Sequence, residues 1–246
     1  MKLADQVVLL TGSNGHIGQA LARDLVPDCQ RLLAVDLAPS AVTDADAALS
    51  YYQCDLANHN EVERLAARLD EHEPPVTVVV NAAGRIHSEP VVNLLDREQG
   101  HHDPLSWRRV LASNLDTTFN VGVCFAERMA RARRGGLIVN ISSIAASGNA
   151  GQSAYSAAKA AVIALSVTWA KELGVYGIRC VSIAPGFIDT PSTHEGLSEK
   201  HVARWVKGTP LRRLGSAAEV ASAIRFVIEN DFYTGRTIEL DGGLRV

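Results

Sequence analysis

The stretch Thr11-Gly12-Ser13-Asn14-Gly15-His16-Ile17-Gly18 follows the apolar run VVLL at residues 7–10 and precedes an amphipathic segment of helical length. Glycines in a turn between a strand and a helix let the backbone approach a pyrophosphate. The N-terminus of the helix then offers free N–H groups and the positive end of its dipole. The candidate pyrophosphate-binding residues are therefore Gly12, Asn14, Gly15, His16, Ile17 and Gly18.

Asp36 lies at the end of the second apolar run, at about the spacing from the glycine turn that a ribose-binding acid has. A carboxylate there accepts hydrogen bonds from the adenosine ribose hydroxyls and repels a 2′-phosphate. The glycine turn contains no Arg or Lys that could neutralise such a phosphate. We therefore expect NAD(H) as the cofactor, in preference to NADP(H).

Short apolar runs alternate with helix-length segments along almost the whole chain. The runs are continuously apolar, which is typical of parallel strands buried on both faces. We predict strands at residues 7–10, 32–36, 50–54, 77–81, 137–142, 179–184 and 237–240, and helices at 16–25, 61–71, 107–133, 154–175 and 217–229. This alternation predicts an α/β fold with a doubly wound parallel sheet, a Rossmann-type three-layer α/β/α domain. No linker or repeat interrupts it, so residues 1–246 form a single domain.

The composition excludes several classes of protein. The 246 residues carry 24 Lys and Arg against 27 Asp and Glu, so bulk charge does not favour nucleic acid or an anionic membrane. No apolar run reaches the length of a membrane-spanning helix. The four cysteines are widely separated, which indicates reduced thiols and a cytoplasmic protein. We expect neither a nucleic-acid nor a membrane partner.

Tyr155 and Lys159 are four residues apart in Tyr-Ser-Ala-Ala-Lys, so they lie one above the other on a helix face. A lysine charge favours tyrosinate and is expected to lower the pKa of the phenol. Tyr155 would then serve as a general acid/base toward an alcohol oxygen.

Further motifs follow in a fixed order: Asp55-Leu56, Asn81-Ala82-Ala83-Gly84, Asn114, Ser142-Ser143, Pro185-Gly186 and Asp241-Gly242-Gly243. Together with the glycine turn, Asp36 and the Tyr-Lys pair, they resemble the short-chain dehydrogenases/reductases of the single-domain branch, over residues 6–243. Within that branch the chain is most similar to 3-oxoacyl-carrier-protein reductases and related secondary-alcohol dehydrogenases.

The resemblance implies a role for each matching residue. Asp55 and Leu56 would flank the adenine, and Asn81, Ala82 and Gly84 would line the cofactor. Ser143 would hold the substrate oxygen near Tyr155, while Lys159 would also bind the nicotinamide ribose. Asn114 would fix a water that links Lys159 to solvent. At the nicotinamide end the resemblance places Pro185, Gly186, Ile188 and Thr190.

The chain departs from the family pattern at three points. His16 occupies the position of the middle glycine, a spacing similar to that of the larger epimerase/dehydratase branch, for whose substrate domain 246 residues leave little room. Ser142 has the usual separation from Tyr155, but Ser143 matches the second serine of the family's strand end, and we choose Ser143. Finally, Asp36 favours NAD, whereas fatty-acid-synthesis reductases of this type generally use NADPH.

We therefore expect an NAD(H)-dependent oxidoreductase, a short-chain dehydrogenase/reductase that interconverts a secondary alcohol and a ketone by hydride transfer. The resemblance implies, as one candidate for the ketone, a 3-oxoacyl thioester on CoA or an acyl carrier protein. The first alternative is a dehydrogenase of a hydroxylated metabolite, such as a steroid, a diol or a sugar-derived alcohol. A remote alternative is a non-catalytic NAD-sensing protein. The resemblance also implies a homotetramer.

Two segments fit the strand–helix alternation poorly. Residues 187–213 are predicted to form a substrate lid, in which Leu197, Val202, Trp205 and Val206 form either an apolar inner face or plain core. Residues 85–104 read as a long polar loop over the edge of the sheet. The loop contains His87, His101, His102 and Asp103, but these show no ligand spacing, so we interpret them as solvated and expect no metal site.

Overall fold

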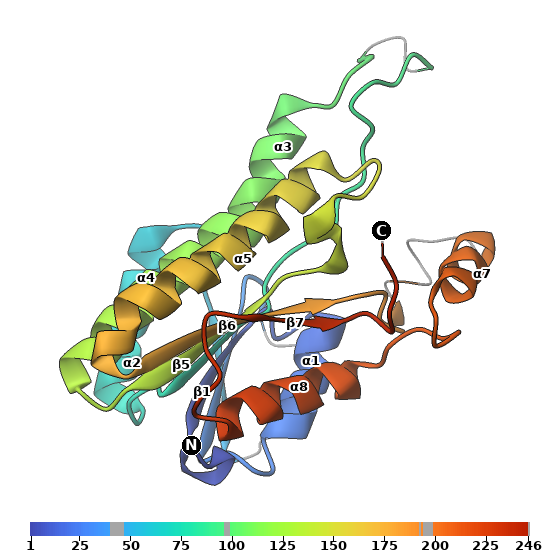
Figure 1. Ribbon diagram of the computed structural model, residues 1–246. Coiled ribbons are helices and arrows are strands. Elements are labelled where there is room, and N and C mark those ends of the chain that lie inside the picture. Colours follow the sequence, from blue (N-terminus) through green and yellow to red (C-terminus); the bar gives the residue numbers. More distant parts are fainter. Residues whose placement is uncertain (40–46, 96–98, 192, 194–198, 246) are drawn as a thin grey trace.

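The computed structural model confirms the predicted fold class. It describes residues 1–39, 47–95, 99–191, 193 and 199–245. Within these residues, seven strands form one parallel sheet in the order β3-β2-β1-β4-β5-β6-β7 (Figure 1). The strands are β1 (Val7–Thr11), β2 (Arg31–Asp36), β3 (Leu49–Gln53), β4 (Val78–Asn81), β5 (Gly136–Ile141), β6 (Ile178–Pro185) and β7 (Thr237–Leu240). The α-helices are α1 (His16–Leu25), α2 (His59–His72), α3 (Pro104–Leu111), α4 (Thr117–Ala132), α5 (Ser153–Leu173), α7 (Glu199–Gly208) and α8 (Ala217–Glu229).

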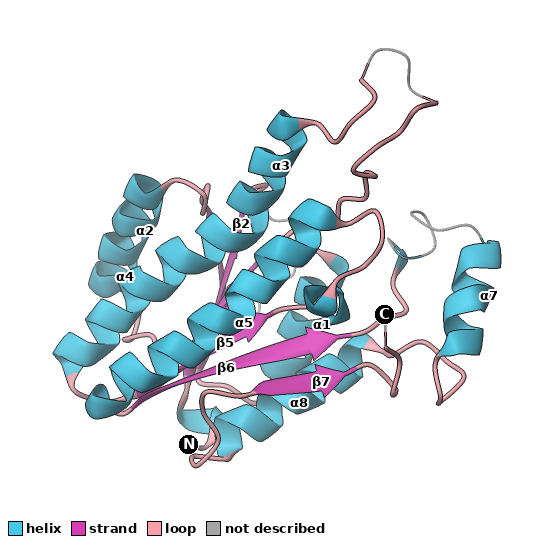
Figure 2. Ribbon diagram, turned by 45° about the horizontal axis from the view of Figure 1, so that its top comes forward, coloured by secondary structure: helices cyan, strands magenta, loops and turns pink. Residues whose placement is uncertain are grey.

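Helices cover both faces of the sheet, which explains why its strands are apolar without alternation (Figure 2). In β1, Val8 and Leu10 pack in one core with α1 and α8, whereas Val7 and Leu9 pack in the other with α2 and α4. None of the described helices combines the length and the apolar character that crossing a bilayer requires.

The strand order reverses at β1, which pairs with β2 on one side and with β4 on the other. Such a reversal opens a crevice at the carboxyl ends of the strands, where ligands bind in open α/β sheets. The glycine turn follows β1 at this point. One crevice is therefore lined by the glycine turn, the end of β2 and the residues after β4.

The long helix predicted at residues 107–133 begins earlier and is interrupted. Asp103 caps α3 by accepting from the N–H groups of Leu105 and Ser106, and Pro104 occupies the first turn, where its missing N–H costs nothing. Pro104 is thus the start of the helix rather than the end of the loop. Between α3 and α4 the chain forms a π-helical turn, Ala112–Asp116.

The polar loop after β4 differs from its prediction in two ways. Because β4 is central in the sheet, the loop projects beyond the N-terminal end of α3 rather than over an edge strand (Figure 1). His101 is exposed, but the His102 side chain is only 13% exposed. The interpretation of this group as uniformly solvated is therefore wrong for His102.

The segment between β6 and α8 includes α7, and contacts between residues 187–189 and Gly215 join its two ends. Ile188 bridges Gly215, and the Asp189 N–H donates to the Gly215 carbonyl over 2.7 Å. The rings of Phe187 and Trp205 stack with centroids 4.3 Å apart, so Trp205 holds α7 against the root of the segment. Leu197, predicted for the inner face of this lid, lies outside the described residues.

Candidate active site

Close backbone packing explains the glycines of the turn after β1. Gly12 has a φ of +69°, and a Cβ there would lie 2.7 Å from the Cα of Ala83. A Cβ on Gly18 would lie closer than 3.0 Å to the carbonyl of Gly12. Gly15 is the N-cap of α1 and supplies no side-chain cap, so the first N–H groups of the helix remain available to an anion.

The end of β2 lies directly against this turn. Asp36 accepts the N–H of Asn14 over 2.9 Å, and its other oxygen accepts the N–H of Ala38. In the described part of the chain, Ser13 Oγ and Asn14 Oδ1 are buried without a hydrogen-bond partner. A cradle of close-packed glycines, an uncapped helix end, a carboxylate and unpartnered polar atoms together fit a dinucleotide. His16 begins α1 and is exposed.

The turn after β4 is bound to the glycine turn through Thr11. Its hydroxyl accepts the N–H groups of Ala82 and Ala83 over 3.1 and 3.2 Å. Asn81 donates to Asn140 on β5 over 2.9 Å, which fixes the end of β4 at the sheet centre. Leu56, which follows β3, is 5% exposed, while Asp55 accepts the N–H of Ala57.

Tyr155 and Lys159 both lie on the inner side of α5, 8% and 5% exposed. Lys159 Nζ lies 5.7 Å from the centroid of the Tyr155 ring and donates to the Ile141 carbonyl over 2.9 Å. Ser143, which follows β5, is hydrogen-bonded to the Tyr155 side chain. The strand end and the helix therefore bring the serine, tyrosine and lysine together.

The two adjacent serines have different surroundings. The buried Ser142 hydroxyl donates to the Lys159 carbonyl over 2.8 Å, so it ties β5 to α5. The half-buried Ser143 hydroxyl accepts the Ala145 N–H over 3.1 Å and is the one beside Tyr155. Ser143 is therefore the serine that faces Tyr155, and the choice of Ser143 as the group that meets the substrate oxygen stays a prediction.

Asn114 lies in the π-helical turn, fully buried. Its Nδ2 donates to the carbonyls of Arg85 and Val110, each over 3.0 Å, while its Oδ1 has no partner among the described residues. A Cβ on Gly84 would lie closer than 3.0 Å to that Oδ1 and 3.3 Å from Lys159 Nζ. Gly84 thus lies between the Asn114 and Lys159 side chains. π-helical turns like the one that carries Asn114 frequently occur at functional sites.

Burial has the largest effect on the pKa values of Tyr155 and Lys159. It raises the pKa of Tyr155, with the hydrogen bond from Ser143 acting against it. Burial also lowers the pKa of Lys159 to about 8. The sequence predicts that the lysine charge lowers the pKa of Tyr155, and this prediction is wrong. Burial penalises the tyrosinate more than its surroundings stabilise it.

The remaining predicted residues lie at the carboxyl end of β6. Pro185 ends the strand, and the Gly186 N–H donates to the Leu240 carbonyl over 2.9 Å. A Cβ on Gly186 would lie 2.9 Å from the Cα of Asp241, which explains the glycine. Ile188 and Thr190 follow, 5% and 7% exposed.

Thr11 and Asn140 support the site, although we did not single them out in the sequence. Thr11 joins the two turns, and Asn140 bonds both Asn81 and, over 2.9 Å, Ser166 of α5. Asn140 did carry a sequence indication, because it is an amide within the apolar run LIVNI of a strand buried on both faces. A buried amide must find partners, so such a residue indicates a fixed polar network.

Comparison with known proteins assigns this arrangement to a family. Residues 13–245 match the family model described as enoyl-(acyl carrier protein) reductase. The chain is 32% identical to the (3R)-3-hydroxyacyl-CoA dehydrogenase of Canis lupus familiaris, covering 99% of this chain and 98% of the relative. It is 33% identical to the 3-oxoacyl-[acyl-carrier-protein] reductase FabG of Thermotoga maritima, covering 99% of both chains. Among solved structures, 4-hydroxyisoleucine dehydrogenase complexed with NADH is 28% identical with a TM-score of 0.88, covering 97% of this chain and 98% of that one.

The chain therefore belongs to the short-chain dehydrogenase/reductase family. It is an oxidoreductase that acts on hydroxyl and keto groups of small molecules with a nicotinamide cofactor.

Proposed function

We propose that this protein is an NAD(H)-dependent reductase of 3-oxoacyl thioesters and, in reverse, a dehydrogenase of 3-hydroxyacyl thioesters. The observation that carries the chemistry is the buried pair Tyr155 and Lys159, with the half-buried Ser143 beside the tyrosine and Asn114 across Gly84.

Each side chain has a distinct task in the proposed reaction. The bound nicotinamide supplies or accepts the hydride at the substrate carbon. Ser143 donates a hydrogen bond to the substrate oxygen and holds it beside Tyr155. Tyr155 gives its proton to that oxygen in reduction and takes one back in oxidation. Lys159 stabilises the tyrosinate that forms, because opposite charges attract strongly at a buried site.

Asn114 is proposed to hold the water through which a proton returns to the site from solvent. Its Oδ1 is an unpartnered acceptor in the described part of the chain, and it faces Lys159 Nζ across Gly84. The two N–H groups of its Nδ2 are shared among the Arg85 and Val110 carbonyls and Ser113 Oγ, each 3.0 Å away, and these contacts fix the direction of the carboxamide. A buried acceptor of this kind suits an ordered water between Lys159 and solvent.

The preference for NAD rests on Asp36. Its carboxylate already accepts two backbone N–H groups beside the glycine turn, so it is held at the place where the adenosine ribose would lie. Both ribose hydroxyls can donate to it, whereas a 2′-phosphate would meet a fixed negative charge. The residues that follow, Leu37, Ala38 and Pro39, supply no cation.

The thioester substrate is supported by the two relatives whose names give one, a 3-hydroxyacyl-CoA dehydrogenase and a 3-oxoacyl-[acyl-carrier-protein] reductase. Thioester carriers, CoA or an acyl carrier protein, are therefore the partners we propose. The 4-hydroxyisoleucine dehydrogenase among the similar structures supports the alternative, a smaller hydroxylated metabolite. For assembly we propose a homotetramer, with Phe119 on α4 offering exposed aromatic surface.

The test is the oxidation of NADH and of NADPH by the purified protein with acetoacetyl-CoA, followed by absorbance. We expect turnover with a preference for NADH. Tyr155→Phe should lower kcat by about 10²-fold to 10⁴-fold while NADH still binds. Tyr176→Phe is the matched control, because Tyr176 is 53% exposed and lies after α5.

Different failures identify different errors in the proposal. Full turnover by Tyr155→Phe would reject the mechanism. A preference for NADPH would reject the role of Asp36. Binding of NADH without turnover of acetoacetyl-CoA would reject the thioester and direct the search to hydroxylated metabolites.

A further inference from the structure

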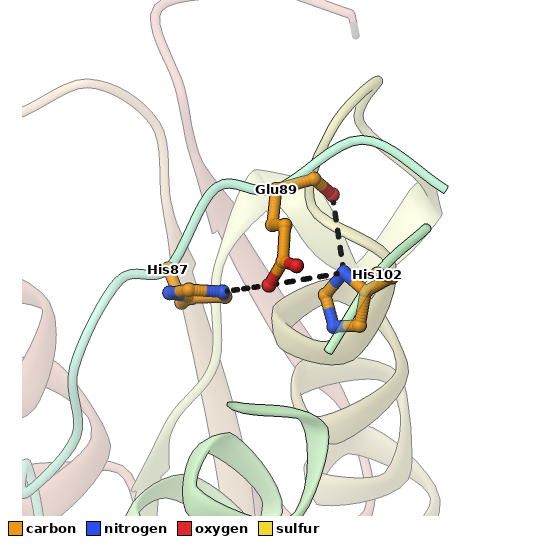
Figure 3. Close-up of side chains that lie close together, drawn as sticks. All are labelled: His87, Glu89 and His102. Carbon is orange, nitrogen blue, oxygen red and sulfur yellow. Dashed lines mark hydrogen bonds and ion pairs between the residues drawn. The ribbon is translucent and has the colours of Figure 1, made fainter. Parts of the chain in front are cut away.

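The polar loop after β4 contains a cluster of three side chains that the proposed reaction does not use: His87, Glu89 and His102 (Figure 3). One ligand atom from each lies within 4.8 Å of the others. The two imidazole rings are almost perpendicular, 81° apart, and the Glu89 carboxylate lies between them.

The distances within the cluster are close to those of a coordination shell. His87 Nε2 lies 2.9 Å from Glu89 Oε2, and His102 Nδ1 lies 3.5 Å from the same oxygen. Ligand atoms bound tetrahedrally at the usual zinc distances are about 3.3 Å from one another. A cation could therefore enter between these side chains with only small rotations.

The carboxylate of Glu89 is fixed by the protein through one of its oxygens. Oε1 accepts the N–H of Asp103 over 2.6 Å, which leaves Oε2 facing both imidazoles. A ligating carboxylate whose second oxygen is hydrogen-bonded is a common feature of metal sites.

His102 faces the Glu89 carboxylate through Nδ1 (Figure 3). This nitrogen lies 3.5 Å from Glu89 Oε2 and 3.2 Å from the Glu89 carbonyl. A neutral imidazole binds a metal ion through either ring nitrogen, and in the tautomer with its proton on Nε2 the Nδ1 lone pair is available to a cation. Nδ1 is therefore the atom that His102 would offer.

We propose that His87, Glu89 and His102 form a binding site for a divalent transition metal ion of the zinc type. Two imidazoles and one carboxylate suit Zn²⁺, Co²⁺ or Ni²⁺, whereas Ca²⁺ and Mg²⁺ require more oxygen ligands. Three protein ligands leave the fourth position of a tetrahedral ion to water.

The location gives the ion a structural effect on the active site. The Glu89 N–H donates to the Gly151 carbonyl over 2.6 Å, and Gln152 Nε2 donates to Ser88 over 3.1 Å. Gln152 precedes α5, the helix that carries Tyr155. A metal ion that joins residues 87, 89 and 102 would hold both ends of the loop against the start of that helix.

The test is a titration of metal-stripped protein with ZnCl₂ by calorimetry, and with CoCl₂ by visible absorbance, which reports tetrahedral coordination. We expect one ion per chain in the wild type. Single His87→Gln and His102→Gln variants should bind at least about 100-fold more weakly. His101→Gln is the matched control, because His101 is adjacent to His102 but exposed, and its affinity should equal that of the wild type.

Glu89→Gln keeps an oxygen acceptor for the Asp103 N–H but removes the charge, so it weakens metal binding while the loop is retained. Circular dichroism and NADH binding verify that each variant is folded. The proposal is overturned if the wild type binds no ion below about 100 μM, a weak affinity for three converging ligands. Equal affinity in the wild type and both histidine variants would also overturn it, because the ion would then be held elsewhere.

Discussion

Gly84→Ala tests whether the spacing between Asn114 and Lys159 matters for catalysis. A Cβ at Gly84 would lie closer than 3.0 Å to Asn114 Oδ1 and 3.3 Å from Lys159 Nζ, where ordinary contact begins at 3.4 Å. The Asn114 carboxamide must move by about 1 Å to restore van der Waals contact. That movement opposes the donor bonds from its Nδ2 to the Arg85 and Val110 carbonyls.

Two effects follow from this displacement. Overpacking a filled site costs about 1 to 3 kcal/mol of the free energy of unfolding. A misplacement of about 1 Å in a catalytic arrangement costs about 10²-fold in rate. We therefore expect the kcat of Gly84→Ala to fall by about two orders of magnitude.

Steady-state turnover of NADH and chemical unfolding measure these two effects separately. Gly174→Ala is the control, since a Cβ at Gly174 would meet nothing within 4 Å and its φ of −56° suits alanine. Wild-type kcat in Gly84→Ala would refute the reasoning, because the position of Asn114 relative to Lys159 would then have no bearing on turnover.

Three further predictions concern neighbouring residues. Ser142→Ala should lower the free energy of unfolding by about 1 kcal/mol with little change in kcat, whereas Ser143→Ala should lower kcat by at least about 10²-fold; the reverse order of rates would assign the catalytic role to Ser142. The pKa of Lys159 falls from 10.5 to about 8, so between these pH values the unfolded chain binds the proton that the folded protein has lost. From pH 8 to 10.5 the free energy of unfolding of the wild type should then rise by about 3 kcal/mol relative to that of Lys159→Met. The same pH dependence of the unfolding free energy in both proteins would contradict this. Trp205→Ala removes the stack on Phe187, so it should raise the KM for acetoacetyl-CoA while kcat changes little, and an unchanged KM would exclude a lid role for α7.

The glycine turn and the fold class were predictable because their causes are local. A strand, a turn with Gly12 and Gly18, and a helix are contiguous, and burial on both faces of a sheet leaves its mark on each strand separately. The placement of Asp36 beside the turn was predictable for the same reason, since parallel strands end at the same edge of a sheet.

The protonation of Tyr155 was not predictable from the spacing to Lys159. An interval of four residues brings the two side chains together. Their desolvation also depends on Val110 of α3, on the end of β5 and on Gly84 after β4, all of which are distant in sequence. Lys159 also has a competing partner, the Ile141 carbonyl, which no local pattern indicates.

The proximity of His87, Glu89 and His102 was not predictable from the sequence, for a related reason. These side chains come from both ends of an irregular loop and are brought together by backbone hydrogen bonds, such as that from the His102 N–H to the Val91 carbonyl over 3.1 Å. Glu89 was not considered at all, because it lies among Ser88 and Pro90 rather than beside the histidine pair. Metal motifs can be recognised in sequence only where a helix or a tight turn fixes the spacing of the ligands.

The burial of Tyr155 and Lys159 also indicates the protonation state of the site before substrate binds. With its pKa raised by burial, Tyr155 holds its proton at neutral pH, and the resting site is a proton donor. In the proposed mechanism, reduction of a ketone uses that form directly, since the tyrosinate appears only as the proton leaves, beside the Lys159 ammonium and the Ser143 hydroxyl. Oxidation of an alcohol requires the tyrosinate first, which burial disfavours. The desolvation that raises the pKa of Tyr155 is therefore consistent with the proposed catalysis. Lys159 then stabilises the tyrosinate only when its negative charge develops, in the transition state, and not in the resting site.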